Sequence, residues 1–377
     1  MAERRSKIPL VLDAGVLRDG PVCELGGWEG VAETGGVAIL PWRHDFLRAE
    51  AASFTATRPH TAPDVTAGAR VVVPESDALA DGTFDQCVVH LQKSRSGTWA
   101  DLAEAWRLLS PGGRLLLEGG NALGIVSAVK RLAEELDQKP RVLSNRARAR
   151  VAAFERGDGP SPVRPVPTPI FLPPVAGTAH AIMTMPGTFS AKQLDPGSGL
   201  LLDHLDDRPA GQREPKRVLD LACGAGPLGL CALQLWPEAK AVLTDGDWRA
   251  VRSAQENATM LGCDDRAEVL WRDASEPIES GAFDLALLNP PFHTGKAVDL
   301  EPARRLFERL RDALRPGGRA LVVANTTLPY ERDLRAWGDV VPVAHARGYK
   351  LLSVVKRSRS SSSSGRQSPG ARSSGRS

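Results

Sequence analysis

The sequence has few cysteines and no long apolar segment, and both scarcities narrow the class of protein. Its five cysteines are an odd number, are widely scattered and include no C-x-x-C spacing. This argues against a disulfide framework and a structural zinc site, and it favours a reducing compartment. No apolar run approaches the roughly 18 residues that a membrane-spanning helix needs. The apolar stretch after the basic N-terminus is broken at Asp13 and is too short for a signal peptide. We therefore expect a cytoplasmic protein without a membrane partner.

The sequence also lacks metal-ligand patterns and a large net charge. The seven histidines show no spacing such as H-x-x-x-H, so we expect no metal. Lys and Arg number 48 against 45 Asp and Glu, a net charge of +3. Six basic residues and no acidic one fall between Lys356 and Ser377, which leaves residues 1–355 with 42 basic against 45 acidic residues and a net charge of −3. The excess positive charge therefore lies in a C-terminal tail that has almost no apolar residue to bury, and we expect this tail to be disordered.

A length of 377 residues suits two domains of medium size. The stretch 157–186 concentrates proline and glycine, which cannot sustain a helix or a central strand, and we interpret it as a linker. The predicted organisation is a first domain over 1–156, this linker, a second domain over 187–355 and the basic Ser/Arg tail over 356–377.

The two halves contain a repeat. Phe84-Asp85 and Phe283-Asp284 lie 199 positions apart, and the Pro-Gly-Gly turns that begin at Pro111 and Pro316 lie 205 apart, so a six-residue insertion aligns them. Each copy has the pattern of a strand, a loop, an amphipathic helix, the Pro-Gly-Gly turn and a second apolar strand. This pattern is typical of a parallel α/β sheet. We therefore expect two tandem Rossmann-like α/β domains.

A glycine-rich turn follows an apolar run in the second half. Gly224, Gly226 and Gly229 form a G-x-G-x-x-G pattern, which lets the backbone turn sharply and approach a ligand. Alone this pattern is weak, because nicotinamide-binding enzymes share it. Asp220, at the end of the preceding strand, favours a cationic, amine-bearing ligand and disfavours a pyrophosphate. We assign Asp220, Cys223, Gly224 and Gly226 to cofactor binding.

Two further acids follow the next apolar segments. Asp245 stands where a carboxylate accepts both hydroxyls of a ribose, and Asp273 stands where one receives an adenine amino group. Asp247 fits a helix N-cap. Three acids at successive strand ends predict a pocket for a positively charged adenosyl ligand. S-adenosylmethionine (SAM) fits this better than NAD.

The fourth strand of the second half ends in Asn289-Pro290-Pro291-Phe292. An exocyclic amine on a base is a poor nucleophile because its lone pair is delocalised into the ring. Acceptors aimed at its two hydrogens, the Asn289 side-chain oxygen and the Pro290 carbonyl, favour the pyramidal geometry and stabilise the positive charge that develops during methyl transfer. The prolines stiffen the loop, and Phe292 offers a face for a planar base. We assign catalysis to Asn289, Pro290 and Phe292, with Asn289 also next to the cofactor.

These residues together resemble the class I SAM-dependent N-methyltransferases, and in particular the bacterial ribosomal RNA guanine-N2 methyltransferases of the RsmC and RlmG type. The segments 187–190 and 194–198 resemble the segment that precedes the SAM motif in this family and lies over the cofactor. The stretches NPPFHTG, PGGRALVVAN and LPY also occur in the order found in the family. The resemblance implies two tandem class I methyltransferase domains, of which the first is degenerate and has lost catalysis.

The first half departs from the catalytic pattern. At the positions of the Asn-Pro-Pro-Phe loop it has His90-Leu91-Gln92-Lys93, and its Gly26-Gly27 and Gly35-Gly36 pairs lack a preceding acid and the right spacing. We predict that it binds no SAM. Basic residues contact phosphates without reading sequence, which suggests RNA binding by the first half, although a solvated basic face is an equal alternative. The candidates are Lys93, Arg95, Arg146 and Arg150.

The predicted function is methylation of the N2 amine of a guanine in ribosomal RNA, with the 16S RNA of the small subunit favoured. The expected cofactor is SAM, the expected partner is ribosomal RNA or a ribosomal subunit, and we expect a monomer. Protein glutamine N5 and DNA adenine N6 methylation are alternatives, because their nitrogens need the same two acceptors. A noncatalytic RNA-binding factor in ribosome assembly is an alternative of another class.

Overall fold

The second half of the chain forms a seven-stranded sheet in the computed structural model. The structure describes residues 11, 15–20, 22–26, 36–40, 43–51, 55–56, 70–73, 77–159, 161, 163, 165–208, 211–291 and 300–358. The strand order in the second half is β13-β12-β11-β14-β15-β17-β16, and all neighbours are parallel except the two pairs that β17 makes. The strands are β11 (Arg217–Leu221), β12 (Lys240–Asp245), β13 (Ala267–Trp271), β14 (Phe283–Leu288), β15 (Leu314–Asn325), β16 (Gly338–Ala346) and β17 (Tyr349–Lys356).

Helices cover both faces of this sheet, because successive strand residues point to opposite sides. Val218 and Leu285 are buried against α5, α6 and α7, whereas Leu219 and Ala286 are buried against α8 and α9. These apolar runs therefore form the buried middle layer of three. The helices are α5 (Pro196–Asp203), α6 (Pro227–Leu235), α7 (Trp248–Met260), α8 (Glu301–Ala313) and α9 (Tyr330–Arg335).

The first half repeats this arrangement. Its sheet has the order β3-β4-β2-β1-β5-β6-β8-β7, which is the order of the second sheet with one more edge strand, β3. The prediction of two tandem Rossmann-like α/β sheets is thus confirmed. The elements are β1 (Val22–Leu25), β2 (Gly36–Ile39), α2 (Arg43–Ala51), β3 (Thr55–Ala56), β4 (Arg70–Val73), β5 (Phe84–His90), α3 (Arg95–Leu108), β6 (Leu109–Gly120), a 3-10 turn (Asn121–Leu123), α4 (Ile125–Leu136), β7 (Arg141–Arg146) and β8 (Ala149–Glu155).

The structure differs from the linker expected over residues 157–186. This stretch contains an antiparallel hairpin of β9 (Thr168–Val175) and β10 (Thr178–Thr184). Ile170, Leu172 and Ile182 are buried in the core of the second half. Prolines are compatible with this hairpin because each strand of a two-stranded sheet has an edge that needs no backbone donors.

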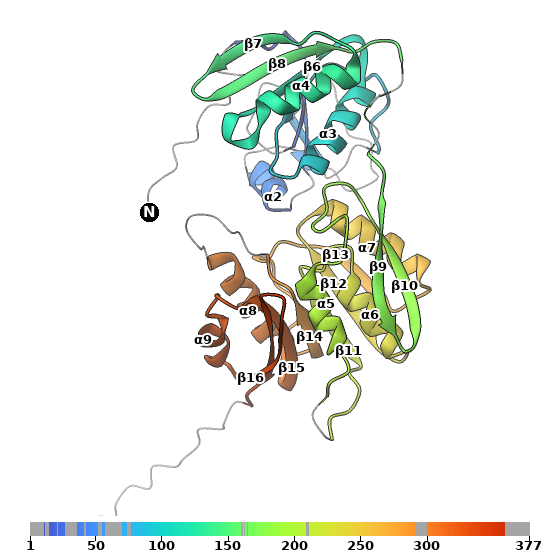
Figure 1. Cartoon of the computed structure of the whole chain (residues 1–377), viewed down its shortest axis with the longest axis vertical. Helices are drawn as coiled ribbons and strands as arrows, with labels where there is room; N and C mark the ends of the chain where they lie inside the picture. Colours follow the sequence, from blue (N-terminus) through green and yellow to red (C-terminus); the bar gives the residue numbers. More distant parts are fainter. Residues whose placement is uncertain are drawn as a thin grey trace, which may run out of the picture.

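Figure 1 shows the two halves stacked, with the first above the second and the green β9–β10 hairpin beside α7. We call them the first and the second unit. Within the described residues, no helix is long and apolar enough to cross a bilayer.

Candidate active site

The glycine-rich turn joins β11 to α6. Gly224 and Gly226 have φ angles of 57° and 85°, in the left-handed region where glycine is favoured, and Ala222 also has a positive φ, of 59°. Asp220 is fully buried beneath this turn, and its Oδ2 accepts a hydrogen bond of 2.7 Å from the amide of Gly229. The turn and the start of α6 are therefore held on the Asp220 carboxylate.

Asp220 retains an unused acceptor. Its Oδ1 is buried and has no hydrogen-bond partner among the described residues. Burial raises the pKa of Asp220 to about 7, although the hydrogen bond from Gly229 acts in the opposite direction. An unpaired buried acceptor is costly, and a positively charged donor offsets that cost while stabilising the ionised carboxylate.

Asp245 and Cys223 lie beside the same turn. Asp245 Oδ2 accepts from the Gly224 amide at 2.7 Å, and Oδ1 accepts from the Asp247 amide at 2.8 Å. Burial raises the pKa of Asp245, and these amides oppose the rise. Cys223 is buried, and burial raises the pKa of its thiol well above the usual value, so it packs as a neutral group. Asp247 caps α7 through the Arg249 amide at 3.0 Å, which confirms the predicted N-cap.

A cavity of about 340 Å³ opens at the carboxyl ends of β11, β12 and β13 and is closed on its other side by the start of α8. Asp245, Asp273 and Pro291 all line it. Asp273 Oδ1 also accepts from the amide and hydroxyl of Ser275, at 2.9 and 2.6 Å, so it orders its own loop. The cavity thus contains the predicted ribose and adenine acceptors, whereas Asp220, Gly224 and Asn289 are not among its lining residues.

Asn289 follows β14 and is held by two residues that the sequence reasoning did not assign. Its Nδ2 donates to Asp195 Oδ2 at 2.7 Å and to Ser198 Oγ at 2.9 Å. Its Oδ1 is buried and has no hydrogen-bond partner among the described residues. The amide is therefore oriented with its acceptor unused. Pro290 is buried, and Phe292 lies outside the described residues.

Asp195 has a second role, which the sequence does signal. Its Oδ2 caps α5 by accepting from the amides of Gly197 and Ser198 at 2.9 and 3.0 Å. Asp followed by Pro196 is a typical helix start. The contact with Asn289 spans 94 residues, so local pattern does not indicate it.

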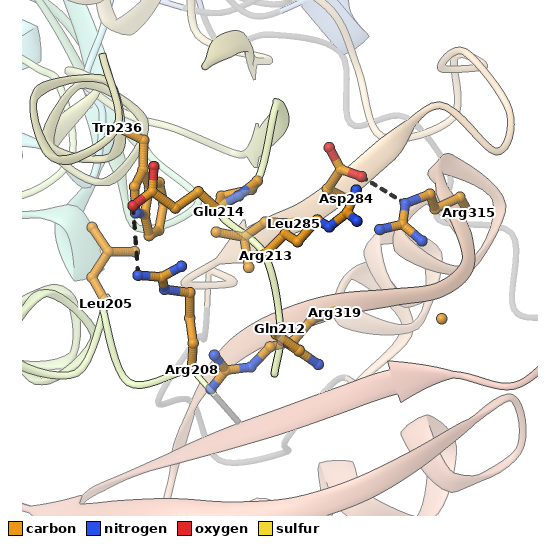
Figure 2. A pocket seen from close by; sticks show the side chains of 12 residues that line it. Leu205, Arg208, Gln212, Arg213, Glu214, Trp236, Asp284, Leu285, Arg315 and Arg319 are labelled. Carbon is orange, nitrogen blue, oxygen red and sulfur yellow. Dashed lines mark hydrogen bonds and ion pairs between the residues drawn. The ribbon is translucent and has the colours of Figure 1, made fainter. Parts of the chain in front are cut away.

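A second cavity, of about 210 Å³, lies near the amino ends of strands β11 and β14 of the second sheet. Figure 2 shows Arg208, Arg213, Arg315 and Arg319 around it, with Arg315 paired to Asp284 at 2.6 Å. Asp284 is the second residue of β14 and Asn289 directly follows the end of the strand, so about 17 Å of strand separates the two regions. This basic cavity is therefore separate from the carboxyl ends of the strands, where Asn289 and the cavity of about 340 Å³ lie.

In the first unit, Glu24 of β1 has the place that Asp220 has in β11. The strand registers show this: Glu24 pairs with Val88, the fifth residue of β5, and Asp220 pairs with Leu287, the fifth residue of β14. The expectation that no acid precedes the first-half glycines is therefore wrong.

His90 has the place of Asn289, as the sequence alignment predicts. Its Nε2 lies 2.9 Å from Glu24 Oε1, and its Nδ1 lies 3.9 Å from Glu118 Oε2. Glu24 is fully buried and His90 nearly so. The two residues that replace Asp220 and Asn289 thus contact each other.

The candidate RNA-binding residues lie in two places on the first unit. Lys93 and Arg95 are exposed where β5 leads into α3. Arg146 is exposed at the end of β7, and Arg150 lies on β8, where it pairs with Asn145 of β7. The register of β6 and β8 pairs Arg150 with Gly119, so both pairs are at the carboxyl edge of the first sheet.

The chain has relatives among known proteins. The model of the methyltransferase small domain family matches residues 179–353. Ribosomal RNA small subunit methyltransferase C of Pseudoalteromonas atlantica is 33% identical over 256 residues, which cover 67% of this chain and 72% of that protein. The protein of the same name from Pseudomonas paraeruginosa is 34% identical over 280 residues, which cover 72% and 80%.

A solved structure matches both units. It is the T. thermophilus 16S rRNA N2 G1207 methyltransferase (RsmC) in complex with AdoMet and guanosine. The TM-score is 0.74 at 28% sequence identity, and the match covers 90% of this chain and 89% of that one.

Proposed function

The chain belongs to the family of ribosomal RNA small subunit methyltransferase C, and from this membership and the geometry of Asn289 we propose that it methylates the N2 amine of a guanine in 16S ribosomal RNA. The main support for this proposal is the buried Asn289 Oδ1, an acceptor with no hydrogen-bond partner among the described residues. The class I fold and the SAM-dependent chemistry follow from the same relatives, one of which is solved with AdoMet and guanosine.

The residues of the second unit fit SAM. Asp220 Oδ1, which has no partner among the residues that the structure describes, suits a cationic amine. The left-handed turn at Gly224 and Gly226 admits close backbone approach, and Asp245 and Asp273 line the adjacent cavity. We assign ribose hydroxyls to Asp245 and the adenine amine to Asp273, and we place Cys223 against the cofactor as a neutral packing group. SAM supplies a methyl group on a positively charged sulfur.

Asn289 and Pro290 orient the guanine amine. Asn289 Oδ1 and the Pro290 carbonyl accept from its two hydrogens, which directs the nitrogen lone pair at the methyl group and stabilises the positive charge that develops on nitrogen. Asp195 and Ser198 hold Nδ2 of Asn289, so the acceptor is aimed before the substrate arrives. The nitrogen loses its proton after transfer, so no general base is needed first. Phe292 stacks on the base.

The first unit contributes RNA contacts in this proposal. Lys93, Arg95, Arg146 and Arg150 lie at one edge of its sheet and would bind phosphates. The substrate is ribosomal RNA, naked or in a subunit, and the enzyme acts as a cytoplasmic monomer.

The test is methyl transfer from tritiated SAM, followed by mass spectrometry of nucleosides. Wild type is expected to form N2-methylguanosine in small-subunit RNA, and Asn289→Ala is expected to abolish this while SAM affinity, measured by calorimetry, stays within about twofold, because Asn289 acts mainly on the acceptor amine. DNA and protein substrates run in parallel distinguish adenine and glutamine methylation. Activity of Asn289→Ala within a few-fold of wild type would show that the mechanism is wrong.

A further inference from the structure

The first unit contacts both loops that carry the cofactor acids. The Arg43 amide, at the start of α2, donates to the carbonyl of Gly246 at 2.7 Å, and Gly246 directly follows Asp245. The Arg43 guanidinium donates to both oxygens of Glu276, from Nε and Nη2, each at 3.0 Å. Glu276 Oε2 accepts in turn from the Asp273 amide at 2.8 Å. One residue of the first unit therefore connects the Asp245 loop to the Asp273 loop.

Aromatic packing supports this contact. Phe46, one turn after Arg43 in α2, is buried and meets the Trp271 ring edge-on, with centroids 4.9 Å apart. The Arg43 guanidinium lies 5.0 Å from the centre of the same indole. Trp271 Nε1 donates to the Gly246 carbonyl at 3.1 Å, so this oxygen receives one donor from each unit. Arg43 is thus fixed by stacking as well as by hydrogen bonds.

The electrostatics point the same way. Burial alone would raise the pKa of Glu276, but the hydrogen bonds from Arg43 and from the Asp273 amide outweigh burial, and the pKa is lowered. The side chains of Arg43 and Glu276 are only 22% and 21% exposed, so solvent weakens this pair less than a pair at the open surface. Loss of Arg43 would leave Glu276 partly buried without its charge partner and would free both loops.

We propose that Arg43 makes the first unit a clamp on the cofactor loops, so that a unit without catalysis sets the SAM affinity of the other. This rests on the proposed function, because it needs SAM at Asp245 and Asp273. Arg43 is a positioning residue that acts through Gly246 and Glu276. Coupling is reciprocal, so SAM binding must also tighten the contact of α2 with the second unit.

The matched control is Arg252, which also crosses between the units. Its Nη1 pairs with Asp77 Oδ2 at 2.6 Å, but Arg252 lies in α7, and its partners Asp77 and Glu256 lie outside the cofactor loops. Arg43→Ala is expected to weaken SAM binding by about tenfold in calorimetry, in line with loss of a charge-assisted pair. Arg252→Ala is expected to stay within about twofold. In a double-mutant cycle, Arg43→Ala and Glu276→Gln should be non-additive.

A second measurement needs no variant. Hydrogen exchange of the α2 amides in the wild-type chain should slow when SAM is added, although α2 contributes no residue to the cavity. The clamp proposal would be wrong if Arg43→Ala and Arg252→Ala bound SAM with equal affinity. It would also be wrong if hydrogen exchange of the α2 amides did not change when SAM is added. Wild-type protein that binds no SAM would instead refute the proposed function itself.

Discussion

Substitution of Asp195 should reduce methyl transfer without removing any group that touches the substrate. The Asn289 amide has two orientations, and only one presents Oδ1 to the guanine amine. In the structure Nδ2 donates to the Asp195 carboxylate at 2.7 Å and to the Ser198 hydroxyl at 2.9 Å. The flipped amide would set its oxygen against the carboxylate, so Asp195 selects the productive orientation.

The magnitude follows from the kind of hydrogen bond that is lost. A bond to a charged group contributes about 1.5–3 kcal/mol, which corresponds to a ten- to hundredfold lower kcat for Asp195→Ala. The neutral bond to Ser198 contributes about 0.5–1.5 kcal/mol, or about two- to tenfold for Ser198→Ala. Single-turnover transfer at saturating SAM and RNA measures both effects on kcat.

Asp195 also caps α5, so stability needs its own control. Loss of an N-cap costs about 1 kcal/mol. Ser94 caps α3 of the first unit by accepting from the Gly97 amide at 3.1 Å, and Ser94→Ala should lower the unfolding free energy similarly while kcat stays near wild type. If Asp195→Ala is folded and its kcat lies within twofold of wild type, the orientation argument is refuted.

Three further predictions concern separate parts of the chain. SAM affinity should rise between pH 6 and pH 7.5, because burial raises the pKa of Asp220 to about 7 and only the ionised carboxylate favours a cation; calorimetry of Asp220→Asn should show no such rise. Gly197→Ala should lower the free energy of unfolding in urea by about 1–3 kcal/mol, because its Cβ would lie 2.7 Å from a methyl of Val323; an unchanged midpoint would contradict this. Alanine at Arg146 and Arg150 together should weaken RNA binding and lower its salt slope by about 1.4–1.8 in filter binding, with SAM affinity unchanged; an unaltered slope would exclude both from phosphate contact.

The fold was predictable because its signals are local and repeated. The Phe-Asp pairs of the two halves are the first residues of β5 and β14. The Pro-Gly-Gly turns lie within β6 and β15. The sequence did not predict the hairpin over 168–184 because proline is rare in ordinary strands. Apolar side chains such as Ile182 stabilise this hairpin by packing on a core that is distant in sequence.

The candidate site was predictable only as far as strand ends reveal it. Asp220, Asp245 and Asn289 all follow or end apolar strands, and the parallel sheet brings these ends to one edge. What sets their chemistry is non-local. Asp195 reaches Asn289 across 94 residues, and Arg43 reaches Glu276 across 233. No spacing rule indicates such pairs, because they depend on how helices and units pack.

The two sheets differ at the matched positions of Asp220 and Asn289, and this difference supports the separate roles that we propose for the units. Asp220 and Asn289 each have one buried oxygen without a hydrogen-bond partner in the part of the chain that the structure describes, which is costly unless a ligand supplies the donors. Their counterparts Glu24 and His90 instead bond each other at 2.9 Å, so the first unit satisfies these groups internally. The first sheet therefore needs no ligand at its strand ends, and the first unit can instead stabilise the second one. In our proposal, Arg43 is the residue through which the first unit contacts the cofactor loops.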